Sequence, residues 1–151
     1  APRHHDRIKY VSDPADRYGI PWALRSIPSG NADLLILDTV GELFDLYGLA
    51  QAAFVGGSLV DLGGQNILEP IAWGVPTLHG PYMGNFLWAM DVVGDHTIQV
   101  ADAAELAQML ISILSHPETY ASKANMARAA LDSARGATQR YADELLKTIP
   151  E

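Results

Sequence analysis

Two pairs of adjacent glycines near the middle of the chain constrain its fold more than any other feature. Gly56-Gly57-Ser58 follows an apolar run at residues 52–55, and Gly63-Gly64 precedes a segment of helical character at residues 67–73. Glycines at such a junction permit the tight turn by which a strand passes into a helix, and they leave room for an anion beside the free N–H groups of the helix's first turn. The pattern is typical of parallel α/β proteins that bind phosphate groups.

The helix that follows these glycines has a recognisable beginning. Asn66 and Glu69 have the spacing of a capping box, in which each side chain accepts a hydrogen bond from a backbone N–H of the first turn. Pro70 is tolerated there because the N–H groups of a first turn have no partner within the helix. We therefore expect a helix that begins near Asn66.

Short apolar runs and helix-like segments alternate along the chain. We expect strands at residues 22–27, 34–37, 53–55, 76–78 and 97–100. We expect helices at residues 5–18, interrupted by Pro14, and at 42–49, 67–73, 85–93, 102–115 and from 117 onward, with a break at Gly136. This order predicts an α/β fold with a doubly wound, Rossmann-like parallel sheet that ends in a helical tail. Such folds bind ligands beyond the carboxyl ends of their strands.

Composition limits the classes of function. A length of 151 residues suits one domain over residues 1–151, and no apolar run approaches the roughly 20 residues that span a bilayer, so we expect this domain to be soluble. The net charge of −8 disfavours binding to nucleic acid. The chain has no cysteine, and its five histidines show no i, i+4 pair, so we expect no metal site.

The first residues read like the end of a strand that runs into a helix, and we expect the chain to be a piece of a longer protein. Arg3 would then lie just past a strand end, where its guanidinium can pair with a phosphate; the alternative is an ordinary surface arginine. His4 is a candidate ligand contact, and an exposed or capping histidine is the alternative.

Five segments together carry a family resemblance. They are Ala1-Pro2-Arg3-His4, Asp38-Thr39-Val40-Gly41-Glu42-Leu43, Phe54-Val55-Gly56-Gly57-Ser58-Leu59, the run from Gly63 to Pro70, and Gly80-Pro81 with Asn85-Phe86. In this order the chain resembles the C-terminal half of the 3-deoxy-D-manno-octulosonic acid (Kdo) transferases, which are two-domain glycosyltransferases of the GT-B type. The resemblance extends over the whole chain.

The resemblance implies a nucleotide-sugar-binding domain that holds CMP-Kdo as its donor substrate, with no other cofactor. A separate N-terminal domain would bind the lipid A precursor and supply an acidic general base, so this chain would hold no catalytic residue and would be inactive alone. The full-length enzyme would act in lipopolysaccharide biosynthesis on the cytoplasmic side of the bacterial inner membrane, either peripheral to it or anchored in it.

The expected donor-binding residues combine the resemblance with the chemistry of the motifs. They are Arg3, His4, Thr39, Gly41, Glu42, Gly57, Ser58, Gly64, Gln65, Asn66 and Glu69.

Several of these residues have a second interpretation. The Ser58 hydroxyl and N–H suit a phosphate oxygen; a serine nucleophile is the competing idea, but the second glycine of a nucleophile elbow is missing at Val60. Residues 38–42 can cap a helix or face the cytidine with their backbone, and these roles are compatible. Glu69 can complete the capping box or, as the resemblance implies, accept hydrogen bonds from ribose hydroxyls.

Two positions depart from the family pattern. Gln65 stands where the family usually has histidine, and Tyr82 replaces the histidine of a Gly-Pro-His segment. Glutamine can donate a hydrogen bond to a phosphate but carries no positive charge. Two other classes of function are kept as alternatives: a sugar-nucleotide epimerase-like enzyme with a UDP-type site, and a nucleotide-binding module without catalysis.

Overall fold

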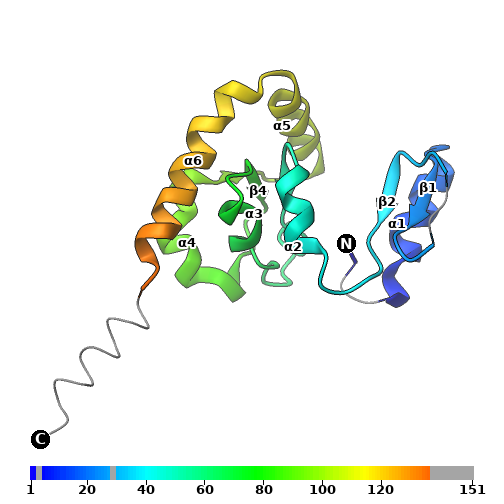
Figure 1. Ribbon diagram of the computed structural model, residues 1–151, viewed down its shortest axis with the longest axis horizontal. Helices are drawn as coiled ribbons and strands as arrows, with labels where there is room; N and C mark the ends of the chain where they lie inside the picture. Colours follow the sequence, from blue (N-terminus) through cyan, green and yellow to red (C-terminus); the bar gives the residue numbers. More distant parts are fainter. Residues whose placement is uncertain (3–4, 28–29, 137–151) are drawn as a thin grey trace, which may run out of the picture. The chain divides into compact units, whose positions relative to one another are not determined.

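The structure of the chain is a computed structural model, which describes residues 1–2, 5–27 and 30–136 (Figure 1). The chain divides into two compact units, Ala1–Leu46 and Tyr47–Glu151. Among the described residues, no helix is both long enough and apolar enough to cross a membrane.

The first unit is built around a pair of parallel strands. Its elements are the 3-10 helix η1 (His5–Arg7), α1 (Lys9–Arg17), β1 (Trp22–Leu24), β2 (Leu34–Ile36) and α2 (Leu43–Leu46). β1 and β2 pair in register from Trp22 with Leu34 to Leu24 with Ile36. The two strands therefore occupy the predicted segments, and their carboxyl ends meet at one edge.

The expected interruption of the first helix at Pro14 is wrong. Helix α1 continues through Pro14 to Arg17, and it buries Ser12 and Ala15 on one face. Proline removes a single N–H from the ladder, while the backbone bond from Ser12 N–H to the Ile8 carbonyl, 3.0 Å, remains on the N-terminal side. A nine-residue helix with a buried face accommodates the ring.

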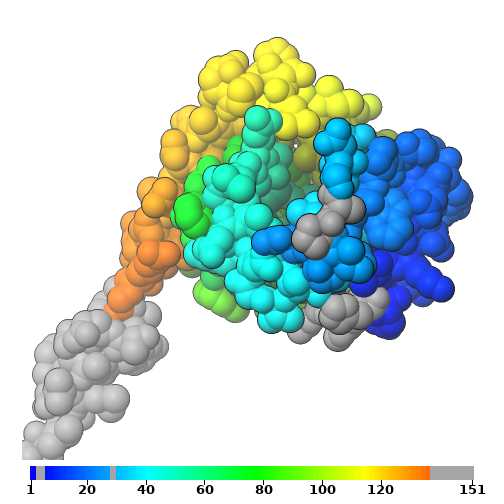
Figure 2. Space-filling view, turned by 45° about the vertical axis from the view of Figure 1, so that its right-hand side comes forward, coloured from blue at the N-terminus to red at the C-terminus, as the bar shows by residue number. Residues whose placement is uncertain are grey.

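The second unit contains a three-stranded parallel sheet in the order β3-β4-β5. Its elements are η2 (Tyr47–Leu49), β3 (Ala53–Phe54), α3 (Leu68–Ala72), β4 (Thr77–His79), η3 (Gly84–Phe86), α4 (Leu87–Val93), η4 (Gly94–His96), β5 (Ile98–Gln99), α5 (Ala103–Ser115) and α6 (Pro117–Ala134). Figures 1 and 2 show α6, yellow to orange, along one side of this unit.

Hydrophobic clusters cover both faces of this sheet. Consecutive strand residues point to opposite faces, and Val55 belongs to one cluster while its neighbour Phe54 packs against the other. The first cluster draws on α3, α4 and α6, and the second draws mainly on β4 and α5. Helices on both faces of a parallel sheet form the doubly wound arrangement, so the predicted fold class is confirmed; the parallel strands are divided between two small sheets.

The C-terminal helices follow the predicted order. The side chain of Asp102 caps α5 by accepting from the N–H groups of Ala104 and Glu105, both at 2.9 Å. Helix α6 ends at Ala134, and Gly136 has a φ of +87°, which fits the expected break. The rest of the expected helical tail, residues 137–151, lies outside the described residues.

Candidate functional site

The two glycine pairs of the second unit are joined by their own backbone. The N–H of Gly64 donates to the carbonyl of Gly57, and the N–H of Gln65 donates to that of Gly56, each at 3.1 Å. Gly57, Gly63 and Gly64 all have positive φ. At the buried Gly64, with φ of +74°, an added Cβ would also lie 2.5 Å from the Met83 sulfur. Glycine is therefore required at this position.

Ser58 lies entirely inside the fold. Its Oγ donates to the Val55 carbonyl at 2.5 Å and accepts from the Gly80 N–H at 2.7 Å. The Ser58 carbonyl in turn accepts from the N–H of Tyr82 at 3.0 Å. The serine thus joins the loop after β3 to the loop after β4, and its predicted contact with a phosphate stays a prediction.

The segment that contains Asn85 forms hydrogen bonds with the same glycine loop. The backbone N–H of Asn85 donates to the Gly63 carbonyl at 2.9 Å, and its side-chain amide reaches the carbonyls of Leu62 and Gly64 at 3.3 and 3.4 Å. The Gly56–Ser58, Gly63–Asn66 and Gly80–Asn85 segments are consequently held together at one end of the sheet.

The expected capping box at α3 is wrong in its details. The N-cap is Ile67, one residue later than predicted, and α3 begins at Leu68. Asn66 Oδ1 accepts from the N–H of Leu68 at 3.1 Å, while its amide nitrogen donates to Glu69 Oε1 at 2.9 Å. The glutamate therefore pairs with the asparagine side chain and not with its backbone, because the two side chains lie on the same side of the turn.

This pairing orients a carboxylate. Glu69 is half-buried, and one of its oxygens is fixed by Asn66. The Glu69 carboxylate also affects Tyr47 of η2. Burial raises the pKa of the Tyr47 phenol, and the negative charge of Glu69 raises it further. Gln65 is exposed, and its amide nitrogen lies 3.8 Å from the position that a Cβ on Gly57 would occupy. A hydrogen-bond donor and an acceptor thus flank the glycine loop.

A separate polar cluster lies in the first unit, beyond the ends of β1 and β2. The Thr39 hydroxyl donates to Glu42 Oε1, and Arg25 Nε donates to Glu42 Oε2, both at 2.8 Å. The pKa of the Glu42 carboxyl lies below its ordinary value. The hydrogen bond from Thr39 is the largest cause, and the hydrogen bond and positive charge of Arg25 add to it. These bonds stabilise the ionised form of Glu42, and its carboxylate braces the turn that contains Gly41.

The same turn is fastened at a second point. The N–H and hydroxyl of Ser26 donate to the two carboxylate oxygens of Asp38, at 2.9 and 2.5 Å. Asp38 and Thr39 were expected to cap a helix, but α2 begins only at Leu43, and both side chains bond elsewhere. Sequence reasoning missed Arg25 and Ser26. Their position directly after β1, at the carboxyl end of a parallel strand, is the signal that would have found them.

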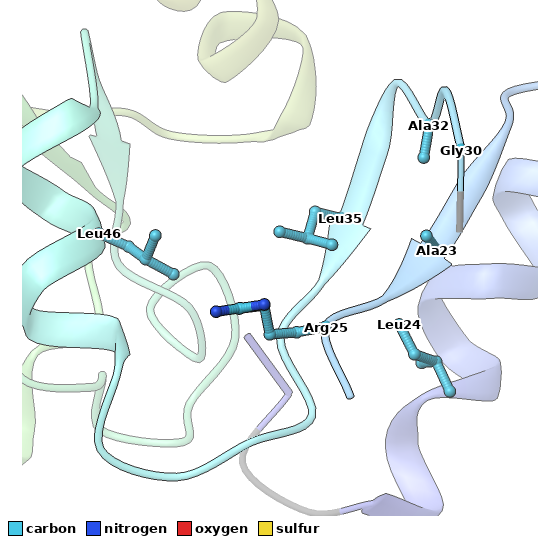
Figure 3. A pocket seen from close by; sticks show the side chains of 7 residues that line it. All are labelled: Ala23, Leu24, Arg25, Gly30, Ala32, Leu35 and Leu46. Carbon is cyan, nitrogen blue, oxygen red and sulfur yellow. The ribbon is translucent and has the colours of Figure 1, made fainter. Parts of the chain in front are cut away.

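A shallow pocket of about 350 Å³ lies within this first unit, lined by Ala23, Leu24, Arg25, Gly30, Ala32, Leu35 and Leu46 (Figure 3). Its walls are mostly apolar, and Arg25 contributes the guanidinium. The arginine therefore belongs both to this pocket and to the brace on Glu42.

The remaining expected site residues fall into two groups. Arg3 and His4 lie outside the described residues. Gly41 is exposed and has a φ of +95°, which favours glycine at the tip of its turn. Among the described residues, no group of three or more His, Asp or Glu side chains is placed to hold a metal ion.

The chain was compared with known proteins by sequence and by structure. No family model matches the chain. It is 34% identical to the 3-deoxy-D-manno-octulosonic acid transferase of Haemophilus influenzae over 99% of its own length, and 33% identical to that of Bordetella pertussis over 95%. These matches cover 36% and 35% of the two enzymes, so the chain spans about a third of their length.

A solved structure agrees with these relatives. The crystal structure of the C-terminal CMP-Kdo binding domain of WaaA from Acinetobacter baumannii matches with a TM-score of 0.79 and 31% identity, covering 87% of this chain and 71% of that one. The fold is thus the Rossmann-like C-terminal domain of a GT-B glycosyltransferase. The chain belongs to the family of 3-deoxy-D-manno-octulosonic acid transferases and corresponds to their C-terminal part.

Proposed function

We propose that this chain is the donor-binding domain of a Kdo transferase and that it binds CMP-Kdo. The observation that carries the proposal is the likeness to a domain described as CMP-Kdo binding, at 31% identity over 87% of this chain. Both curated relatives are transferases of the same sugar.

The geometry of the second unit supports the nucleotide site. Gly57 bears no side chain that would block a phosphate, Gly64 allows the loop to pack closely against Met83, and the Gln65 amide lies beside Gly57 as a hydrogen-bond donor. Glu69, oriented by Asn66, can accept hydrogen bonds from two neighbouring ribose hydroxyls because an ionised carboxylate has two acceptor oxygens. We assign phosphate to the glycine loop and ribose to Glu69.

The other expected contacts are part of the same proposal. Arg3 would pair with the phosphate, His4 is a further candidate contact with the donor, and the backbone of the turn around Thr39, Gly41 and Glu42 would face the cytidine. Glu42 holds that turn through its own bonds to Thr39 and Arg25. Ser58 acts from within, by fixing the shape of the loop.

The chemistry assigned to this domain is stabilisation of the leaving group. Transfer by direct displacement breaks the bond between Kdo and the CMP phosphate, and hydrogen-bond donors around that phosphate stabilise the charge that develops on it. The general base and the lipid A precursor would belong to an N-terminal domain. The whole enzyme would act in lipopolysaccharide biosynthesis at the cytoplasmic face of the inner membrane, without a cofactor other than the donor substrate.

Calorimetric titration of the 151-residue chain with CMP, UMP and AMP tests the proposal. We expect CMP to bind more tightly than either of the others. Glu69→Gln should weaken CMP binding, since it removes the charge that strengthens hydrogen bonds from ribose, whereas Glu118→Gln on the exposed start of α6 should not. Absence of CMP binding, or an equal response to all three nucleotides, would refute a CMP-Kdo site; a preference for UMP would favour the epimerase-like alternative.

A further inference from the structure

One buried titratable side chain of the second unit has no role in the proposal above. His79 is the last residue of β4 and is only 2% exposed. It immediately precedes Gly80, whose N–H bonds to Ser58. The histidine therefore adjoins the loop that we assign to the phosphate.

The surroundings of the ring determine which nitrogen carries the proton. His79 Nδ1 lies 2.7 Å from the Gly80 carbonyl oxygen, which can only accept, so Nδ1 must donate. Nε2 lies 3.0 Å from Thr97 Oγ1 and, in a neutral ring, accepts the hydroxyl proton. Thr97 Oγ1 also lies 2.8 Å from the Gly94 carbonyl, which accepts from the Thr97 N–H at 3.1 Å as well, so the hydroxyl proton is shared between Nε2 and this carbonyl. The neutral Nδ1–H tautomer satisfies the Gly80 carbonyl and leaves Nε2 as an acceptor that faces the Thr97 hydroxyl.

Burial favours this neutral form. It lowers the pKa of the His79 imidazole, and the hydrogen bond to Gly80 only partly opposes the effect. The ring consequently offers a fixed donor to Gly80 at neutral pH.

Both backbone polar groups of Gly80 are held as a result. Its carbonyl accepts from His79, and its N–H donates to Ser58 Oγ at 2.7 Å. Ser58 continues the chain of contacts to the Val55 carbonyl at the end of β3. The histidine is thereby connected through two hydrogen bonds to the Gly56–Ser58 turn.

We propose that His79 is a positioning residue, whose Nδ1–H sets the Gly80 backbone and, through Ser58, the glycine turn that receives the donor phosphate. The part concerning the phosphate rests on the proposed function. A histidine that merely fills the core would be replaceable by any side chain of similar volume. A positioning histidine is replaceable only by a side chain that keeps a donor at the Nδ1 position.

Paired substitutions separate these two roles. His79→Asn retains an amide donor close to the Nδ1 position, while His79→Leu fills similar space without a donor. Thr97→Val removes the partner of Nε2 and leaves the bond to Gly80. Calorimetry with CMP should show at least about fivefold weaker binding for His79→Leu, the cost of one hydrogen bond, and changes within about twofold for the other two variants. CMP binding that is unchanged in His79→Leu, or lost equally in the asparagine and leucine variants, overturns the proposal.

Nitrogen NMR of the chain without ligand tests the link independently of CMP. The imidazole of His79 should show a protonated Nδ1 and an unprotonated Nε2, and His79→Leu should shift the amide signals of Gly57 and Ser58 more than His79→Asn does. The opposite tautomer, or equal shifts, overturns the positioning role even if the wild-type chain binds no CMP. If the tautomer and shifts are as expected but CMP does not bind, the proposed nucleotide site fails and the structural link stands.

Discussion

Gly80→Ala provides a sharp test of how the loops after β3 and β4 fit together. A Cβ added to Gly80 would lie 2.1 Å from the Ser58 carbonyl oxygen, 2.4 Å from its carbonyl carbon and 2.6 Å from the Leu59 nitrogen. All three atoms are backbone, so no flexible side chain can move aside. Since Cβ contacts below 3.0 Å essentially never occur, the two loops must separate by about 0.9 Å, the difference between that limit and 2.1 Å.

The cost follows from what this separation breaks. Overpacking of this kind costs about 1–3 kcal/mol. The bonds from Gly80 N–H to Ser58 Oγ and from Tyr82 N–H to the Ser58 carbonyl would both lengthen, at about 0.5–1.5 kcal/mol each. A total near 4 kcal/mol would lower the thermal midpoint by about 8–16 °C, because 1 kcal/mol corresponds to about 2–4 °C in a chain of this size.

Far-UV circular dichroism during heating and urea titration measures this loss, since α5 and α6 of the second unit are the longest helices among the described residues. Gly84→Ala is the matched control, because a Cβ there meets nothing within 4 Å. We expect the control to unfold within about 0.5 kcal/mol of the wild type. Equal midpoints for the two variants would show that the close contact at Gly80 is not a property of the folded chain.

Three further predictions concern the polar contacts. Arg25→Gln should raise the pKa of Glu42 toward its ordinary value, as measured by carboxyl NMR, and should weaken CMP binding. The thermal midpoint should change little, because the Arg25–Glu42 ion pair is exposed. Arg128→Gln on α6 is the control and should leave CMP affinity unchanged; an equal loss of affinity in both variants would show that the bond from Arg25 to Glu42 does not support CMP binding. Ser58→Ala should cost about 1–3 kcal/mol in urea unfolding, because a buried N–H loses its acceptor, and a neutral result would contradict that bond. The pKa of His79 is lowered in the folded state, so below about pH 6.5 the unfolded chain binds more protons at this residue than the folded chain does, and the stability of the fold should fall as the pH drops. His79→Asn should lose this part of the pH dependence. Parallel curves of stability against pH for the variant and the wild type would show that His79 does not cause it.

The sequence predicted the elements better than their side-chain partners. Strand positions were predicted to within a few residues, as at Leu34–Ile36 and Thr77–His79, because runs of buried apolar residues report burial directly. The partners of Ser58 and Arg25 could not be predicted, since Gly80 and Glu42 lie 22 and 17 residues further along the chain. Such pairs depend on how separate turns meet, which local patterns do not encode.

Local signals also failed where two side chains had competing partners. The spacing of Asn66 and Glu69 fits a capping box, yet their side chains bond to one another. The departure at Gln65 was visible in the sequence, but its position beside Gly57 required the fold. Residue types and their spacing in the sequence therefore located the candidate site, whereas the partner of each side chain was found only in the three-dimensional structure.

The backbone bonds between the two glycine turns have a consequence for rates. Gly64 and Gln65 fasten the loop to Gly57 and Gly56 before any ligand arrives, so binding need not order the loop first. Arrival of an anionic nucleotide would then be governed by encounter, and the net charge of −8 opposes that encounter. Added salt should screen the repulsion and speed association. Under the proposed function, the rate at which donor binds would therefore depend on ionic strength and not on a rearrangement of this loop.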